Sequence, residues 1–452
     1  MTHMDTSWME QEDSVDSTPV SVYLWIPFIW YAIAATRSIT FWVPGSGNRT
    51  GIDLSYTEGS SVDRAIYSVL IAAGIWVLIR KRIPWSHIAR CNMWVIAILV
   101  YSLISMLWSD FPEVLFKRWV KLFGSIVMSL IVLTEPAPVE AISTLLRRCL
   151  LIHIPLDIVL VKYFRNIGVG WDDMGIEMWT GLTKHKNVLG QVCMVGGLYF
   201  IWDSVKKLGK RRCLVNIFYL AMIGYLMNGP GSSRSITAIL VLFIGLLIFF
   251  GLRFAPRDKD LLNRFLIKGA IALIFVMASI QFGFSAFTGD RSLVDVTLKA
   301  SGKDTTLTGR TELWEDILVY ASRNPVQGVG YGSFWIGDQA NNLWERHYWK
   351  PKQGHNGYID VYVELGMIGL VLMGGLLVSV FVNVRDAITR DFEFGRFRMA
   401  LFVMVVIHNF AESSFLRGDN DVWFIFLLVA MNMGFPASEG VPETSSLIES
   451  AT

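Results

Sequence analysis

Charged residues are scarce in this sequence. Asp, Glu, Lys and Arg make up 17% of its 452 residues, whereas 53% are hydrophobic. Ordinary soluble domains contain about 25% charged residues, so the composition excludes that class and predicts a protein that crosses a membrane many times. The formal net charge of +2 says little by itself, and no nucleic acid is expected as a partner.

Cysteine is scarce as well. The four cysteines are Cys91, Cys149, Cys193 and Cys213, and each falls inside a predicted span or near its cytoplasmic end. A disulfide framework is therefore not expected, and the spacing fits no zinc site. The sequence also has no nucleotide-binding loop and no HExxH pair, so neither a cofactor nor a metal is expected.

The N-terminus shows no sign of a cleavable signal peptide. Its first 19 residues, MTHMDTSWMEQEDSVDSTP, are polar and acidic and contain no basic region, which a signal peptide requires. We expect residues 1–20 to be a disordered cytoplasmic segment and the first apolar run to be a retained anchor. The polar residues 437–452 are expected to form a disordered cytoplasmic tail.

Long apolar runs dominate the rest of the chain. Because about 20 apolar residues cross a bilayer, we expect an all-α polytopic membrane protein with about twelve transmembrane helices. Helices 1–9 are placed within residues 21–283, and helices 10–12 within residues 356–436. The predicted spans are 22–42, 62–80, 91–108, 119–135, 142–163, 186–203, 213–228, 235–252, 265–283, 365–383, 397–411 and 421–436.

The charge of the connecting loops alternates along the chain. About four or five Lys and Arg occur in each of RKRIPWSHIAR, DSVKKLGKRRC, RFAPRDKDLLNR and NVRDAITRDFEFGRFR. About one occurs in each of VPGSGNRTGIDLSYTEGSS, NGPGSSRS and ESSFLRGDND. Basic loops remain in the cytoplasm, so both termini are predicted to lie there.

One outer loop, residues 284–355, is much longer than the others, and loops of this length usually carry function. Its stretch TGRTELWEDILVYASRNP has apolar residues at helical spacing, which predicts a short amphipathic helix on the membrane surface. In the next stretch, VQGVGYGSFW, three glycines at 328, 330 and 332 let the backbone turn tightly or approach a ligand. For Trp314, Phe334 and Trp335 we favour anchoring at the membrane interface, with stacking on sugar rings as the alternative.

Basic residues at the outer helix ends are out of place under this charge pattern. Arg234 in GPGSSRSIT and Arg310 in LTGRT have small or glycine neighbours, so their guanidinium groups are accessible to an anionic headgroup. Arg118 and Lys186 occur at two further outer ends, where snorkelling of a lysine to lipid headgroups is the simpler interpretation. His355, in QGHNGYID, stands at the start of a predicted membrane helix.

This set of residues suits group transfer from an activated lipid. ATP is absent outside the inner membrane, so a donor must arrive activated, and a glycan linked to a lipid diphosphate meets that requirement. Cations would stabilise the leaving diphosphate. A histidine such as His355 would take the proton of an acceptor hydroxyl.

Several stretches resemble the O-antigen ligase and polysaccharide polymerase superfamily. TLTGRTELWEDIL, NPVQGVGYGSFW and HNGYIDVYVELGMIGL resemble its signature region, and LWSDFPEVLFKRWVKL, GLTKHKNVLGQ and GSSRSITAIL resemble blocks of its exopolysaccharide-polymerase branch. The blocks cover most of the chain from Trp108 to Gly369. The resemblance implies an inner-membrane glycosyltransferase of the GT-C type, with a periplasmic loop over the active site. It also implies an undecaprenyl-diphosphate-linked donor and no metal.

The resemblance also implies roles for individual residues. His355 corresponds to the catalytic base, and Arg310 and Arg234 to residues that bind the diphosphate. Arg118 and Lys186 match more weakly, as further diphosphate-binding residues.

The neighbours of the base allow more than one interpretation. Asn356 either orients the acceptor or caps the following helix. Asp360 could orient His355, but a solvated helix face is favoured. Glu412, together with His408, is a candidate for supporting the site from another outer helix end.

The remaining alternatives concern the acceptor and the class of protein. A ligase moves a finished polymer to lipid A-core sugar, whereas a polymerase moves a growing chain to a single lipid-linked repeat, and the blocks slightly favour a polymerase. Expected partners are the lipid-linked donor, a glycan or lipid-linked acceptor, membrane lipids and other polysaccharide-assembly proteins. A secondary transporter or flippase is disfavoured because no internal repeat is visible. A scaffold explains neither the arginines nor the loop.

Overall fold

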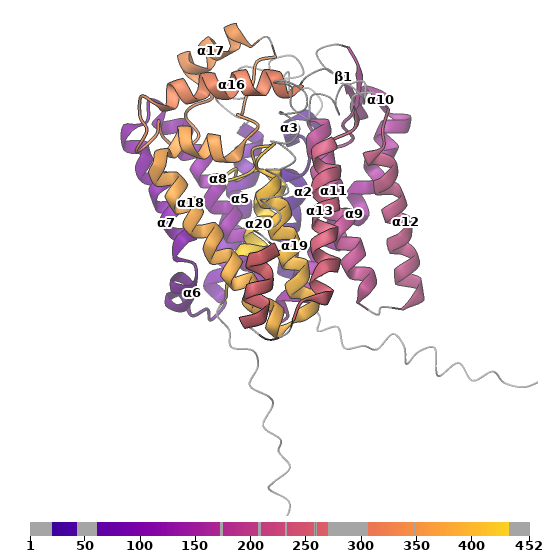
Figure 1. Cartoon of the computed structure of the whole chain (residues 1–452). Helices are drawn as coiled ribbons and strands as arrows, with labels where there is room; N and C mark the ends of the chain where they lie inside the picture. Colours follow the sequence, from indigo (N-terminus) through magenta and orange to yellow (C-terminus); the bar gives the residue numbers. More distant parts are fainter. Residues whose placement is uncertain are drawn as a thin grey trace, which may run out of the picture.

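The computed structural model describes residues 20–42, 61–171, 175–206, 209–230, 233–256, 258, 260–269, 306–347 and 349–433, except the side chains of 210, 306–309 and 311. Most of these residues are helical, as predicted (Figure 1). One antiparallel pair corrects the all-α prediction: β1 (Val169–Trp171) and β2 (Glu177–Trp179) are hydrogen-bonded strands. The predicted span 265–283, the loop segment 284–305 and both terminal segments lie wholly or largely outside the described residues.

The helices before β1 form the first half of the bundle. Two of them, α8 and α9, begin with proline, which is favoured in the first turn because its missing N–H would be unsatisfied there. These elements are η1 (Val22–Leu24), α2 (Trp25–Ala34), α3 (Ile39–Trp42), α5 (Ser61–Arg80), α6 (Trp85–Cys91), α7 (Met93–Ile104), η2 (Ser105–Trp108), α8 (Pro112–Leu133), α9 (Pro138–Tyr163) and α10 (Arg165–Gly168).

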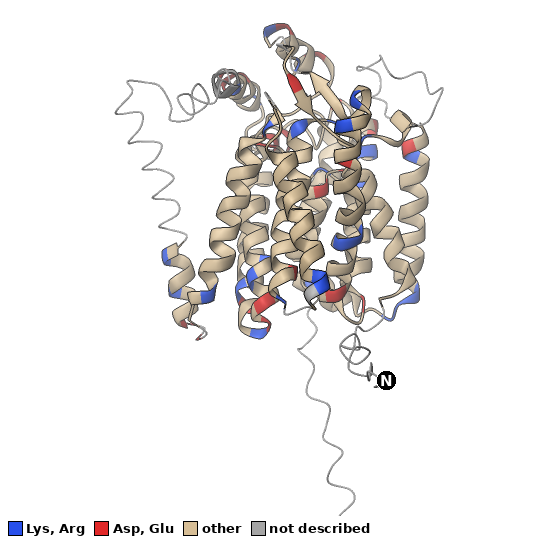
Figure 2. Ribbon diagram, turned by 90° about the vertical axis from the view of Figure 1, so that its right-hand side faces the viewer, with Lys and Arg blue, Asp and Glu red and all other residues tan. Residues whose placement is uncertain are grey.

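The helices after β2 complete the bundle, and α16 and α17 lie across one end of it, which we call the outer end (Figure 1). Lys, Arg, Asp and Glu gather mostly at the two ends of the bundle (Figure 2). The elements are α11 (Lys186–Val205), α12 (Lys210–Met227), α13 (Ile236–Gly251), η4 (Leu252–Phe254), α16 (Thr306–Ala321), α17 (Gly337–Arg346), α18 (Gly357–Arg390), α19 (Phe392–His408) and α20 (Asp421–Ala430).

Several of these helices are long and apolar enough to cross a membrane. α5, α11, α13 with η4, and α18 each qualify, and two bent pairs, α6 with α7–η2 and α8 with α9, are further candidates. η1–α2 and α20 are apolar but shorter. The described residues thus support four to six candidate spans, and the twelve spans and the GT-C architecture remain predictions.

Helix α11 lies at the centre of the bundle. In its apolar window 78% of the residues are buried, against 28–33% in α5, α13 and α18, so α11 is surrounded by protein and the other three face outward. It packs against α9, α12, α13 and α19. Close packing depends on small residues: a Cβ on Gly197 would lie 2.9 Å from a methyl group of Leu242. The N-terminus of α11 is therefore held at the middle of the outer end.

Helix α18 is broken at Gly366, whose φ of 66° and ψ of −163° are not helical. The glycine-rich loop before α17 occupies the break. Met367 N donates to Pro325 O (2.9 Å), and Gly330 N donates to Glu364 O (2.8 Å). These bonds satisfy backbone groups that the break would otherwise leave unpaired, which is costly at membrane depth.

The three loop glycines all have positive φ, as a tight turn requires. A Cβ on Gly328 would lie 2.4 Å from the carbonyl oxygen of Glu364. The close approach that the sequence suggested is therefore an approach to α18, within the chain itself.

A second, smaller core lies beneath α16. Leu313 and Ile317 are fully buried there against Phe334 and Trp335, which are also fully buried. The prediction that Phe334 and Trp335 anchor the protein at the membrane interface is therefore wrong, because both rings fill this core. Trp314 is half-buried, and its indole N–H donates to Gly354 O (2.7 Å).

Candidate active site

Glu412 is the centre of the candidate site. It lies in the segment between α19 and α20 and is 4% exposed. Its Oε2 is 3.0 Å from His355 Nδ1, and its Oε1 is 3.2 Å from Arg310 Nη2 and accepts a hydrogen bond from Asn187 Nδ2. We call Glu412, His355, Arg310 and Asn187 the Glu412 cluster. A carboxylate buried this deeply requires such partners, since an unpaired buried charge is very costly.

His355 is held in an unusual backbone conformation directly before α18. Its φ is 48°, in the left-handed region that residues other than glycine rarely occupy and that often marks functional sites. An ionised carboxylate only accepts hydrogen bonds, so pairing with Glu412 assigns the hydrogen to Nδ1 of His355. In the neutral imidazole the lone pair then lies on Nε2, which is the nitrogen suited to take a proton from a substrate.

The charge of Glu412 is fixed by its neighbours. Burial by itself would raise the pKa of this carboxyl, but the charge and hydrogen bond of His355, followed by the charges of Arg310 and His408, hold the pKa well below its usual range. Glu412 is therefore ionised at neutral pH.

Arg310 comes from α16 and reaches the same segment with two of its donors. Nη1 donates to Ala411 O (2.7 Å), and Nη2 pairs with Glu412. The guanidinium has five donors in all, and its side chain is 20% exposed. The structure thus brings Arg310 and His355 together through Glu412 and leaves Arg310 with capacity for an anion.

Lys186 is the first residue of α11, and His185 caps that helix. His185 Nδ1 accepts a hydrogen bond from Asn187 N (3.2 Å). Burial is the main cause that lowers the pKa of His185 to about 4; the charge of Glu412 opposes this shift, and the charges of Lys186, His355 and Arg310 add to it. His185 is therefore neutral at pH 7, and these residues share one electrostatic environment.

Arg234 is exposed and stands directly before α13. Its neighbours Ser233 and Ser235 line a small cavity together with Lys186 and Gly190. The entrance to α13 therefore lies beside the first turn of α11. The structure places the residues on either side of Arg234 beside Lys186, and a shared site for the two cations stays a prediction.

Arg118 belongs to a different group of residues. It extends from α8, and its Nη1 donates to Gly332 O in the glycine-rich loop. Gly332 N donates in turn to Glu364 Oε2 (2.8 Å), which is buried in α18. Arg118 thus holds the loop, and its predicted contact with a diphosphate stays a prediction.

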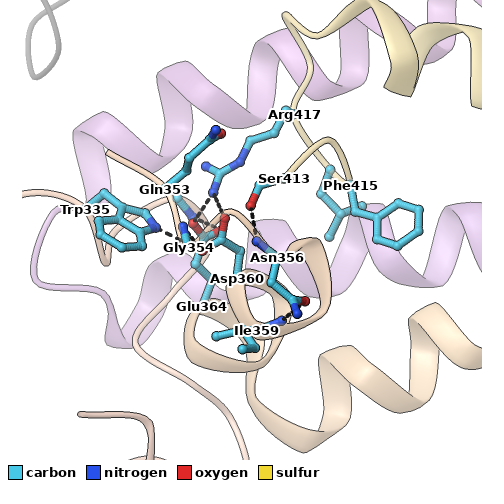
Figure 3. A network of polar contacts seen from close by, with 12 residues as sticks. Trp335, Gln353, Gly354, Asn356, Ile359, Asp360, Glu364, Ser413, Phe415 and Arg417 are labelled. Carbon is cyan, nitrogen blue, oxygen red and sulfur yellow. Dashed lines mark hydrogen bonds and ion pairs between the residues drawn. The ribbon is translucent and has the colours of Figure 1, made fainter. Parts of the chain in front are cut away.

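A second buried cluster consists of Arg417, Asp360 and Glu364, which we call the Arg417 cluster (Figure 3). Arg417 Nη2 is 3.1 Å from an oxygen of each carboxylate. Asp360 is 3% exposed, so the prediction of a solvated helix face is wrong.

Asp360 acts on the segment that carries the histidine. Its Oδ1 accepts hydrogen bonds from Trp335 Nε1 (3.1 Å) and Gly354 N (3.0 Å). In the described part of the structure Asp360 does not bond to the imidazole itself but fixes Gly354, the residue directly before His355. It therefore supports the position of the backbone from which the imidazole extends.

Asn356 is a helix cap. Its Oδ1 accepts from Tyr358 N (3.0 Å) and Ile359 N (3.2 Å), and its own N–H donates to Ser413 Oγ (3.1 Å) (Figure 3). Of the two interpretations left open by the sequence, the structure shows capping. The bond to Ser413 also joins the start of α18 to the segment that carries Glu412.

Sequence reasoning did not single out Asn187, Arg417 or Asn409. Asn409 is fully buried and organises the segment after α19: its Oδ1 accepts from Ser414 N and Phe415 N (both 3.0 Å), and its Nδ2 donates to Ser414 Oγ (2.8 Å). The available signal was the polar run HNFAESS at the end of an apolar helix, because buried polar groups require partners.

The fold is that of a multi-pass membrane protein, and the Glu412 cluster lies at the outer end of its helix bundle. Residues 230–374 match the family described as O-Antigen ligase, and this region contains Arg234, Arg310 and His355. This match supports the O-antigen ligase and polysaccharide polymerase superfamily that the sequence predicted.

Two relatives are informative. The exopolysaccharide production protein ExoQ of Rhizobium meliloti is 29% identical over 333 residues, which cover 70% of each chain. An uncharacterized protein of Haemophilus influenzae is 23% identical over 180 residues, covering 37% of this chain and 45% of its own. The similarity to ExoQ extends well beyond the matched family region and supports the same superfamily.

Proposed function

We propose that this protein is a glycosyltransferase that moves a glycan from an undecaprenyl-diphosphate carrier to a sugar hydroxyl, at the outer face of a bacterial inner membrane. The observation that carries the proposal is the Glu412 cluster. It places a histidine with one assigned proton beside an arginine, at the outer end of an apolar helix bundle.

His355 is the proposed base. Glu412 holds the Nδ1 hydrogen and thereby orients the ring, so that Nε2 takes the proton of the acceptor hydroxyl. A partner carboxylate also stabilises the imidazolium that forms, as in other histidine–carboxylate pairs.

The leaving diphosphate is proposed to bind between Arg310, Lys186 and Arg234. All three side chains are cationic and would attract the two phosphates. The N-terminus of α11 adds the positive end of a helix dipole. A diphosphate that gains charge as its bond to the sugar breaks is stabilised by these groups.

The reaction is a single displacement in this proposal. The acceptor oxygen forms a bond to the anomeric carbon while the bond from that carbon to the carrier phosphate oxygen breaks. The electron pair of the broken bond remains on the diphosphate, and the acceptor proton passes to His355. We propose that the reaction uses no metal.

The acceptor distinguishes two versions of this function. The name of ExoQ, an exopolysaccharide production protein that is similar over 70% of the chain, favours a polymerase that extends a lipid-linked repeat. The description of the matched family as O-Antigen ligase favours transfer of a finished polymer to lipid A-core sugar. We favour the polymerase because the similarity to ExoQ covers more of the chain.

The test is mass spectrometry of undecaprenyl-linked glycans in a deletion strain that expresses either the wild type or His355→Ala. Accumulation of single repeats in the His355→Ala strain identifies a polymerase, and accumulation of long chains identifies a ligase. If His355→Ala restores the same lipid-linked pool as the wild type, His355 is not the base and the proposal fails.

A further inference from the structure

Trp349 lies beside the proposed base. Its ring centroid is 5.7 Å from that of His355, and the two ring planes are inclined by 47°. The indole is half-buried: it packs against the small core beneath α16 while part of its surface remains accessible. A partly accessible indole therefore lies next to the imidazole.

The backbone that follows Trp349 is held in place. Lys350 has a φ of 45°, and its N–H donates to His347 O (2.9 Å), which closes a tight turn around Trp349. Just beyond, Trp344 Nε1 donates to Pro351 O (2.7 Å). A non-glycine residue in the left-handed region is strained and persists only where its surroundings impose it.

The same turn is tied to α16. His347 is buried, and its Nε2 lies 3.0 Å from Asp316 Oδ2, while Arg346 Nη1 lies 2.8 Å from Asp316 Oδ1. The rings of His347 and Trp349 are in edge contact, with centroids 6.2 Å apart. The indole is thus held in place before any ligand arrives, which lowers the entropic cost of binding.

We propose that Trp349 is the stacking platform for the acceptor sugar. This inference rests on the proposed function. The base must come within hydrogen-bond distance of the acceptor hydroxyl, so the sugar that binds beside His355 is the acceptor. A pyranose ring has an apolar face of C–H groups that packs on an indole, while its hydroxyls at the ring edge point toward neighbouring polar groups.

The structure also shows which aromatic side chains are accessible for stacking on a sugar. Phe334 and Trp335 are fully buried, so neither ring can meet a ligand. Among the ring pairs of the described residues, Trp349 is the partner of His355. The ligand class is therefore a pyranose of the acceptor glycan, recognised through its C–H face.

The test uses two substitutions at Trp349 in the full-length protein, reconstituted with a synthetic lipid-linked repeat unit. Trp349→Leu keeps an apolar side chain for packing but has no aromatic face, whereas Trp349→Phe keeps a face. The expected result is an increase in KM for the acceptor of about tenfold for Trp349→Leu, the order of one aromatic contact. KM for the donor should be unchanged, and Trp349→Phe should remain within about threefold of the wild type.

The control is Trp171→Leu, at a tryptophan that is 65% exposed in β1, and it should match the wild type.

Two results would overturn the inference. In one, Trp349→Leu matches Trp171→Leu in all constants. In the other, both substitutions at Trp349 lower kcat, alter both KM values and reduce Tm together, which is the result expected of a packing role alone. If the wild type itself transfers no glycan, the proposed function fails, and that outcome is distinct from both.

Discussion

Gly357 and Asn409 are packed so closely that a Cβ on Gly357 would lie 2.2 Å from Asn409 Oδ1. Gly357 N also donates to Asn409 O (2.8 Å). The start of α18 is thus joined directly to the residue that organises the Glu412 segment. His355 and Glu412 come from these two segments, so this contact sets their relative position.

Gly357→Ala should therefore disturb the site from outside it. The added methyl group must displace Asn409, so we expect a loss of about 1–3 kcal/mol in the free energy of unfolding and a lower kcat. Thermal unfolding in detergent and transfer kinetics would measure both. Gly224→Ala in α12 is the control, because a Cβ there meets nothing within 4 Å. Equal behaviour of the two variants would show that the contact is not important.

Glu412→Gln should weaken His355 as a base while keeping a side chain of nearly the same shape at position 412. The amide no longer requires a hydrogen on Nδ1 of His355 and no longer stabilises an imidazolium, so kcat should fall by about 10²–10⁴-fold. Steady-state kinetics with the lipid-linked donor would show this. A control is Glu113→Gln, at an exposed residue in the first turn of α8, which should have no effect. A Glu412→Gln enzyme with wild-type kcat would exclude an orienting role.

Stability should decrease as the pH falls below about 6.5. The pKa of His185 is about 6.5 in the unfolded chain and about 4 in the folded protein. Between these values the unfolded chain takes up a proton that the folded protein does not, so the free energy of unfolding falls with pH, by at most about 3 kcal/mol. The lowered pKa of Glu412 acts in the same direction, and its contribution is lost below about pH 4.5.

His185→Asn provides the matching measurement. Asparagine keeps a side-chain acceptor for the N-terminus of α11 but does not titrate in this range. Tm measured from pH 7 to pH 5 should vary less for this variant than for the wild type. An unchanged pH profile would show that His185 is not the group responsible.

Arg417→Met should be among the most destabilising substitutions in the outer segments. It leaves Asp360 and Glu364, which are 3% and 4% exposed, without their cation. Breaking a buried ion pair from one side costs about 3–5 kcal/mol. The comparison is Lys121→Met, since Lys121 and Asp419 form a more exposed pair that is worth about 1 kcal/mol or less. The triple variant Arg417→Met, Asp360→Asn and Glu364→Gln should recover part of the loss.

Reasoning from the sequence selected site candidates that are unusual in their local sequence. His355 and Arg310 are polar residues in short motifs beside apolar runs, where such residues require a reason. Glu412 received less weight because 57 residues separate it from His355, and no local pattern reports a pairing over that distance. The same limit hid Arg417, whose carboxylate partners lie in α18.

The wrong predictions concern residues whose environment is formed by tertiary contacts. Phe334 and Trp335 look like interface anchors because they are aromatic and follow a polar loop, but they fill a core formed by α16 and α18. Asp360 looks solvated because it follows a glycine-rich stretch, but Trp335, Gly354 and Arg417 surround it. Helix α20 begins at Asp421, where the span was predicted to begin, but it ends at Ala430 rather than at residue 436, because the backbone becomes extended at Met431.

The break in α18 has a consequence for biosynthesis. The backbone groups around Gly366 pair with residues 325–330, which precede α18 in the chain. During translation these partners leave the ribosome before the helix that needs them. The loop is therefore already present when α18 enters the bilayer, and its interrupted hydrogen bonds can be completed as the helix is inserted.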